Sequence, residues 1–183
     1  MTSFAPLAGI IKVMAIRSAG ILLYRLASKG YEVLLVHPGG PFWARKDLGS
    51  WSIPKGEFDE SEQPLAAAKR EFQEEVGFDA PEGNYRELGE AKQPSGKLVY
   101  GFALEAKVDI NQFKSNLFEM EWPPKSGKRQ KFPENDEVAW VPLPVALEKV
   151  VKGQRPFIEK LAAELGQSLN SIDSHDTPQV SLF

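Results

Sequence analysis

Apolar and polar residues follow two different spacings along this chain, and each spacing predicts a kind of element. Runs rich in Ile, Leu, Val and Tyr at 18–26 and 31–38 flank a Ser-Lys-Gly turn, which is the pattern of a β-hairpin. From about 63 to 76, apolar residues recur every three or four positions, as on one face of a helix. Pro64 suits the first turn of that helix, and Gly77 can take the left-handed conformation that ends it.

The second half of the chain continues this alternation of elements. Two strands joined by a turn are predicted within 84–106, and a further strand begins near 137. Two helices are predicted at 144–151 and 156–165. Strands, one central helix, more strands and terminal helices favour an α/β sandwich, in which a mixed sheet is covered by helices on both sides.

Residues 111–135 hold aromatics, prolines and basic residues, and they predict a long loop. We expect one domain at 18–166, preceded by an extension or edge strand at 1–17 and followed by a polar tail at 167–183. Met14 stands directly before the regular pattern, so residues 1–13 fit either an upstream extension or an edge strand.

Composition narrows the possible chemistry. The chain has 183 residues and a formal net charge of -3, which argues against a general nucleic-acid binder but leaves local basic patches open. It has no cysteine and two histidines, so cysteine and histidine metal clusters are excluded and any metal must be held by oxygen. The apolar run at the start contains Lys12 and is too short to span a bilayer, so we expect a cytoplasmic protein without a membrane partner.

Three carboxylates stand out on the central helix. Glu71, Glu74 and Glu75 lie at positions i, i+3 and i+4, so all three project from one helical face. Like charges at this spacing repel, and a cation would offset that cost. Ligands that are all oxygen select a hard ion such as Mg²⁺ or Mn²⁺. The alternative is a solvated acidic surface.

The same stretch resembles the signature of the Nudix (MutT-like) hydrolases. That signature is Gly, five residues, Glu, seven residues, Arg-Glu, an apolar residue, any residue, Glu-Glu, any residue, Gly and an apolar residue. Its positions are filled here by Gly56, Glu62, Arg70, Glu71, Phe72, Glu74, Glu75, Gly77 and Phe78. In character the chain is most similar to the bacterial diadenosine tetraphosphate hydrolase and MutT-type branch.

The resemblance implies roles for the residues of the signature. Glu74 and Glu75 match the principal metal ligands of the family, and Glu71 matches a further ligand or a water-activating carboxylate. The carbonyl of Gly56 often completes such a metal shell. Arg70 matches an arginine that orients a glutamate through charge-assisted hydrogen bonds.

The implied reaction is Mg²⁺-dependent hydrolysis of a nucleoside diphosphate linked to another group, by attack of water on phosphorus. Family members place the general base either within the signature or on a distant loop. Within the signature we favour Glu71. Outside it the candidates are Glu121, Glu134 and Glu137, for which surface charge is the alternative explanation.

Residues outside the signature would choose the substrate. Lys55 directly precedes the metal loop, and Arg45 and Lys46 could contact a polyphosphate. Basic residues further along could extend that cradle: Lys128, Arg129 and Lys131. Flat aromatic faces for a purine are offered by Phe42, Trp43, Phe118, Trp122 and Phe132, of which we expect one or two to touch a base.

We therefore expect a nucleotide-type small molecule as substrate and no stable nucleic-acid partner, in a monomer or homodimer. Asymmetric cleavage of dinucleoside polyphosphates such as diadenosine tetraphosphate ranks first. Oxidised nucleoside triphosphates rank second, and ADP-ribose and other diphosphate-linked compounds follow. The alternative class is a non-catalytic nucleotide-sensing module on the same fold, although such modules commonly lose the glutamates that this chain retains.

Overall fold

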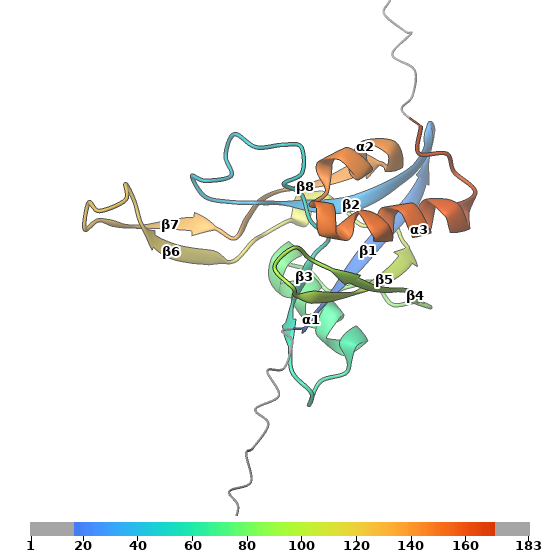
Figure 1. Cartoon of the computed structure of the whole chain (residues 1–183), viewed down its shortest axis with the longest axis horizontal. Helices are drawn as coiled ribbons and strands as arrows, with labels where there is room; N and C mark the ends of the chain where they lie inside the picture. The colour runs from blue at the N-terminus through green and yellow to red at the C-terminus, as the bar shows by residue number, and fades with distance from the viewer. Residues whose placement is uncertain (1–16, 171–183) are drawn as a thin grey trace, which may run out of the picture.

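A computed structural model describes residues 17–170, and it is organised around one mixed six-stranded sheet (Figure 1). The strands run β4-β5-β1-β2-β8, and β3 pairs with β1 beside this path. The pairing of β1 with β5 is parallel, whereas the other pairs are antiparallel. The predicted extension at 1–17 and tail at 167–183 lie mostly outside the described residues, so the division of the chain stays a prediction.

The sequence predicted most of these elements close to where they occur. The strands of the sheet are β1 (Arg17–Ala27), β2 (Gly30–Pro38), β3 (Lys55–Phe58), β4 (Arg86–Lys92), β5 (Leu98–Glu105) and β8 (Asn135–Pro142). The helices are α1 (Pro64–Val76), α2 (Leu143–Lys149) and α3 (Arg155–Leu165), with short 3₁₀ turns η1 (Ile110–Gln112) and η2 (Lys152–Gln154). Within this range no helix has both the length and the apolar character needed to cross a membrane.

Helices cover both faces of the sheet, which confirms the predicted α/β sandwich. On one face α1 buries Ala68, Phe72 and Val76 in a core that includes Ile21. On the other face α2 and α3 pack over a second core. Since β1 supplies residues to both cores, it reads as a continuous apolar run rather than an alternating one.

The prediction of a long loop at 111–135 was wrong. This stretch contains a second sheet of two antiparallel strands, β6 (Leu117–Glu121) and β7 (Arg129–Pro133), which projects from the body of the molecule (Figure 1). Each strand has only five residues, and the segment between them is rich in proline, glycine and lysine. The alternating pattern was therefore too short to outweigh the loop signals. We call β6, β7 and their connection the β6–β7 arm.

Candidate active site

Arg70 is the centre of an ionic network on α1. Its Nε and Nη2 atoms donate to the two oxygens of Glu62, at 3.1 and 2.9 Å, and Nη2 also donates to the carbonyl of Glu57 at 3.1 Å. Its Nη1 atom lies 2.5 Å from Glu71 and 3.4 Å from Glu74. The hydrogen bonds to Glu62 and Glu71 raise the pKa of Arg70 above its usual value. This arginine therefore fixes the start of the helix and the Glu71 carboxylate together.

The Glu71 carboxylate packs directly on Gly56, which lies in β3. A Cβ atom added at Gly56 would lie 1.8 Å from Glu71 Oε2, so any larger residue would displace this carboxylate. The side chain of Glu71 is only 14% exposed. Close contact between α1 and β3 thus explains why the metal-loop position is a glycine.

Glu75 reaches the residue next to this glycine. Its carboxylate accepts a hydrogen bond of 2.9 Å from the backbone nitrogen of Lys55. The pKa of Glu75 is raised to about 7. Burial is the main cause, Lys55 opposes it, and the negative charges of Glu71 and Glu134 add to it. Glu74 is more exposed, at 48% of its side chain. Two of the three carboxylates therefore meet at the segment Lys55–Gly56, where negative charge is disfavoured.

These residues fit a hard divalent cation in the chemistry of their donors. All the side-chain donors are carboxylate oxygens, and a cation would offset both the burial and the like charges that raise the pKa of Glu75. Across residues 17–170, no three acidic or histidine side chains already converge tightly enough to form a metal site. The carboxylates of Glu71 and Glu75 are engaged by other partners, because Arg70 binds Glu71 and the backbone N–H of Lys55 binds Glu75.

The structure separates the three candidate distal bases. Glu134 follows β7, lies close enough to Glu75 to raise its pKa, and accepts a hydrogen bond of 2.8 Å from Gly39 at its backbone carbonyl. Glu121 instead accepts from the backbone nitrogen of Gly127 within the β6–β7 arm, at 2.8 Å. Glu137 lies in β8, where its backbone stands opposite that of His37 in β2. Among these three, Glu134 alone contributes to the raised pKa of Glu75.

The predicted substrate contacts are divided between two places. Lys55 borders the carboxylates of α1. Trp43, Arg45 and Lys46 lie in the loop between β2 and β3, and the Lys46 ammonium is 4.5 Å from the centre of the Trp43 ring. A cavity of about 460 Å³ opens beside this loop. It is lined by His37, Ala44, Arg45, Lys46, Asp47, Trp51, Asp136 and Glu137.

Sequence reasoning missed the histidine that fixes this loop. His37 Nδ1 lies 2.6 Å from the Asp136 carboxylate, and its Nε2 lies 2.6 Å from the carbonyl oxygen of Lys46. The ring is 7% exposed. His37 thus ties the basic loop to β2 and β8, and nothing in the local sequence indicates a contact between residues ninety-nine positions apart.

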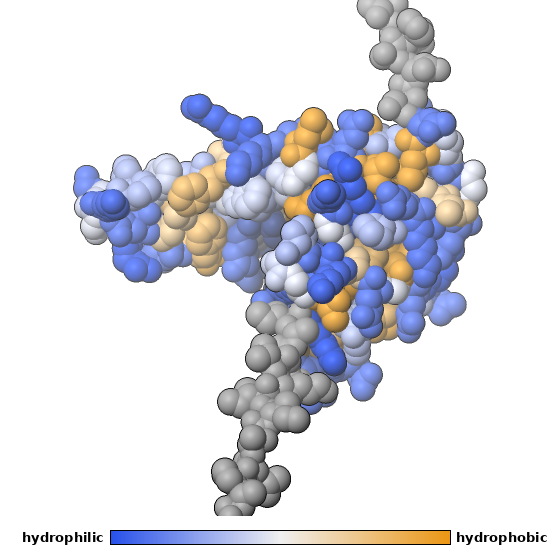
Figure 2. Space-filling view, in the orientation of Figure 1, coloured by the Kyte–Doolittle hydropathy of each residue, from blue (hydrophilic) through white to orange (hydrophobic). Residues whose placement is uncertain are grey.

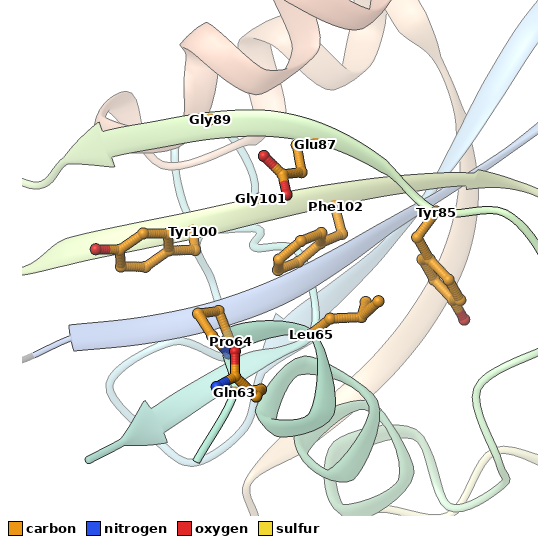
Figure 3. A pocket seen from close by; sticks show the side chains of 9 residues that line it. All are labelled: Gln63, Pro64, Leu65, Tyr85, Glu87, Gly89, Tyr100, Gly101 and Phe102. Atoms are coloured by element: carbon orange, nitrogen blue, oxygen red, sulfur yellow. The ribbon is translucent and has the colours of Figure 1, made fainter. Parts of the chain in front are cut away.

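A second pocket, of about 370 Å³, was also missed (Figure 3). The aromatic side chains of Tyr85, Tyr100 and Phe102 lie along it opposite Leu65 in the first turn of α1. It is lined by Gln63, Pro64, Leu65, Tyr85, Glu87, Gly89, Tyr100, Gly101 and Phe102, without a basic residue. Since Glu75 lies about 15 Å further along the helix axis, this pocket does not suit the phosphates of a substrate held there.

The fold and the carboxylate face define a hydrolase of pyrophosphate bonds. The NUDIX domain family model matches residues 14–161, and the chain therefore belongs to the Nudix family, whose members generally use divalent metal ions. An RNA pyrophosphohydrolase of Bartonella henselae is 25% identical over 85% of this chain and 92% of its own length. An asymmetrical bis(5'-nucleosyl)-tetraphosphatase of Rattus norvegicus is 31% identical over 51% of this chain and 67% of its own.

Solved structures agree on the fold. A C. elegans Ap4A hydrolase in a binary complex superposes with a TM-score of 0.55 and 22% identity, over 83% of this chain and 98% of that one. At this identity the similarity concerns the arrangement of the sheet and helices. It confirms the predicted Nudix-type sandwich.

We expect Gly56→Ala to destabilise the protein by about 1–3 kcal/mol, because the new methyl group would occupy the space of the Glu71 carboxylate. Urea unfolding of the metal-free protein measures the change. The matched control is the pair Glu71→Ala and Gly56→Ala/Glu71→Ala, in which the clash is removed. If Gly56→Ala costs as much in the Glu71→Ala background as in the wild type, the contact is not the cause.

The raised pKa of Glu75 predicts a pH-dependent gain from Glu75→Gln. The folded protein holds the Glu75 proton up to about pH 7, whereas the unfolded chain loses it near 4.5, so stability falls as pH rises between these values. The metal-free Glu75→Gln variant should be more stable than the wild type by up to about 3 kcal/mol at pH 8, with little gain at pH 4.5. Chemical unfolding at both pH values measures this.

Glu74→Gln is the control for that experiment, because its side chain is half exposed and should change stability by less than about 0.5 kcal/mol. An equal gain for both variants, or a gain for Glu75→Gln that is the same at both pH values, would contradict the burial of the Glu75 charge.

Proposed function

We propose that this chain hydrolyses a phosphoanhydride bond in nucleoside polyphosphates, with dinucleoside polyphosphates such as diadenosine tetraphosphate as the leading substrates. The observation that carries this proposal is the meeting of Glu71 and Glu75 at the segment Lys55–Gly56, with Arg70 behind them. Carboxylates so placed can hold a divalent ion, and Lys55 can contact a phosphate beside it. A nucleotide-type small molecule fits this combination of charges.

Mg²⁺ or Mn²⁺ is the metal we propose, with Glu71, Glu74, Glu75 and the Gly56 carbonyl as ligands. Bound there, such an ion would neutralise the diphosphate and lower the pKa of the attacking water. Arg70 would keep the Glu71 carboxylate in place through the contact of 2.5 Å. Arg70 acts through Glu71 in this proposal and does not touch the substrate.

Glu134 is the general base that we favour among the distal candidates. Glu71 is engaged by Arg70 on one side and by Gly56 on the other, which suits a ligand better than a base. Glu134 follows β7, and its negative charge is near enough to raise the pKa of Glu75. In this proposal Glu134 takes a proton from water on the open side of the carboxylates.

The relatives and the basic loop bear on the choice of substrate. The rat relative that cleaves dinucleoside tetraphosphates is 31% identical, and the loop with Arg45, Lys46 and Trp43 could hold a distant phosphate and base. RNA that carries a 5'-polyphosphate is a second candidate, because the B. henselae RNA pyrophosphohydrolase matches over 85% of this chain. Oxidised nucleoside triphosphates, of the MutT type, and ADP-ribose follow.

A sensing module without turnover is the alternative class, and the complete set of glutamates favours the enzyme over it. The cytoplasmic location and a monomeric or homodimeric state stay predictions from the sequence.

Turnover of a substrate panel tests the proposal. Diadenosine tetraphosphate, 8-oxo-dGTP, ADP-ribose and a 5'-triphosphorylated RNA are incubated with Mg²⁺, and the products are separated by chromatography. We expect Glu74→Gln/Glu75→Gln to lower kcat by at least about 10²-fold, because the charge stabilisation by the ion is lost. The control is Glu60→Gln/Glu159→Gln, which removes two exposed carboxylates elsewhere. Equal activity of the two double variants would refute the metal assignment.

Glu134→Gln should lower kcat by about 10²–10⁴-fold while Mg²⁺ affinity stays near the wild-type value. Glu121→Gln and Glu137→Gln should leave kcat within about threefold, because Glu121 is bonded to Gly127 within the arm and Glu137 lies in β8 opposite His37. The pH dependence of kcat and Mg²⁺ titration measure the two effects. If Glu134→Gln is also nearly silent and Glu71→Gln removes the acidic limb of the pH profile, Glu71 is the base.

A further inference from the structure

The two faces of the β6–β7 arm differ in character. Residues paired across the strands share a face, so Glu119 with Lys131 and Glu121 with Arg129 form a charged face. That face is neutralised internally, since Arg129 also donates to Glu119 at 2.6 Å. The other face consists of Phe118, Met120 and Phe132, which are apolar and half-buried, and of the exposed Gln130. Figure 2 shows this apolar band partway along the arm, with hydrophilic residues at its tip.

The apolar face of the arm meets the basic loop between β2 and β3. The Phe42 and Trp122 rings are 5.4 Å apart and nearly perpendicular. The Phe118 ring packs against Gly40, where a Cβ atom would lie 3.1 Å from it. An edge-to-face contact leaves ring faces uncovered, and Phe42 is 57% exposed. Trp43 is 37% exposed, and Lys46 lies over one of its two faces. The arm and the loop together present flat aromatic surfaces to solvent.

Uncompensated positive charge lies at both ends of this aromatic surface. Lys125 and Lys128 are exposed at the tip of the arm, and Arg45 and Lys46 are exposed in the loop. Within residues 17–170, none of these four forms an ion pair. The arm, residues 117–133, carries four basic and two acidic residues in a chain whose net charge is -3. The charge balance of the arm is therefore opposite to that of the whole protein.

The root of the arm is attached to the carboxylate helix. The backbone nitrogen of Lys114 donates to the carbonyl of Val76, the last residue of α1, at 3.0 Å. Glu134, the residue after β7, donates its backbone N–H to the carbonyl of Asn116 at 2.8 Å. Five residues of extended strand then carry the surface about 17 Å outward from this root. A chain bound along the arm would begin at the carboxylates.

We infer that the β6–β7 arm and the loop with Arg45 and Lys46 bind a single-stranded nucleic acid whose 5' end enters the carboxylate site. Aromatic faces that stack bases, flanked by cations that contact the backbone, are the combination that single strands require. An acidic peptide would use the cations but not the aromatic faces, and a second copy would bring the same cations together. The inference deepens the proposed function and rests on it for the position of the 5' end.

Binding of an unphosphorylated RNA of about ten nucleotides tests the surface independently of turnover. Fluorescence anisotropy is measured for the full chain, for Trp122→Ala and for Lys125→Ala/Lys128→Ala. The control is Lys29→Ala/Lys107→Ala, which removes two exposed lysines elsewhere. We expect both arm variants to bind at least about fivefold more weakly than the control. The lysine variant should also reduce the slope of log K against log salt by about 1.4. Circular dichroism checks that the variants are folded.

A DNA strand of the same sequence is measured in parallel, because stacking and phosphate contacts do not require a 2'-hydroxyl. A 5'-triphosphorylated form of the RNA then links the surface to the active site. The arm variants should raise its KM while the KM of a nucleoside triphosphate stays unchanged.

Equal RNA binding by the arm variants and the control would overturn the inference even if dinucleotides are hydrolysed. A dimer that forms in sedimentation experiments and is lost in Trp122→Ala, without RNA binding, would assign the surface to a second copy instead. Arm-dependent RNA binding without turnover of any substrate would refute the proposed function and still support the surface.

Discussion

The contact between α1 and β3 is the constraint on which the site depends. Three carboxylates on one helical face repel one another, so they need both a cationic partner and a fixed support. Arg70 supplies the first by holding Glu62 and Glu71 at once. Gly56 supplies the second, because only a residue without a side chain lets the Glu71 carboxylate rest on the strand. The signature residues thus hold one another in position, in addition to supplying the charged groups of the site.

The sheet holds this unit in place through β1. This strand pairs with β2, β3 and β5 and sends alternate side chains into the two cores, so it is buried on both faces. Its pairing with β3 sets Gly56 opposite Ala19, beneath the helix. Phe72, the neighbour of Glu71 and about 100° around α1 from it, is fully buried in the same core. Packing of this apolar side of the helix therefore fixes where the adjacent carboxylates project.

Local patterns were enough to predict the parts of the site that are continuous in sequence. The helix from Pro64 to Val76 follows from its apolar spacing and from its proline and glycine ends. The sequence could not rank Glu121, Glu134 and Glu137 as candidates for a distal general base. Their distances from α1 depend on how the arm packs against the end of β2. The hydrogen bond from Gly39 to Glu134 settles that geometry, and it joins residues ninety-five positions apart. His37 and Asp136 escaped notice for the same reason.

Net charge describes this molecule poorly, because its charges are segregated. The carboxylates of the candidate site are concentrated on α1, where burial and like charge raise the pKa of Glu75 to about 7. The uncompensated cations lie instead on the loop at Arg45 and Lys46 and at the tip of the arm. An anionic substrate would therefore be attracted at the periphery and repelled at the centre until a cation is bound there. Such an arrangement favours an extended substrate, whose distant phosphates can reach the basic loop while one anhydride lies over the carboxylates.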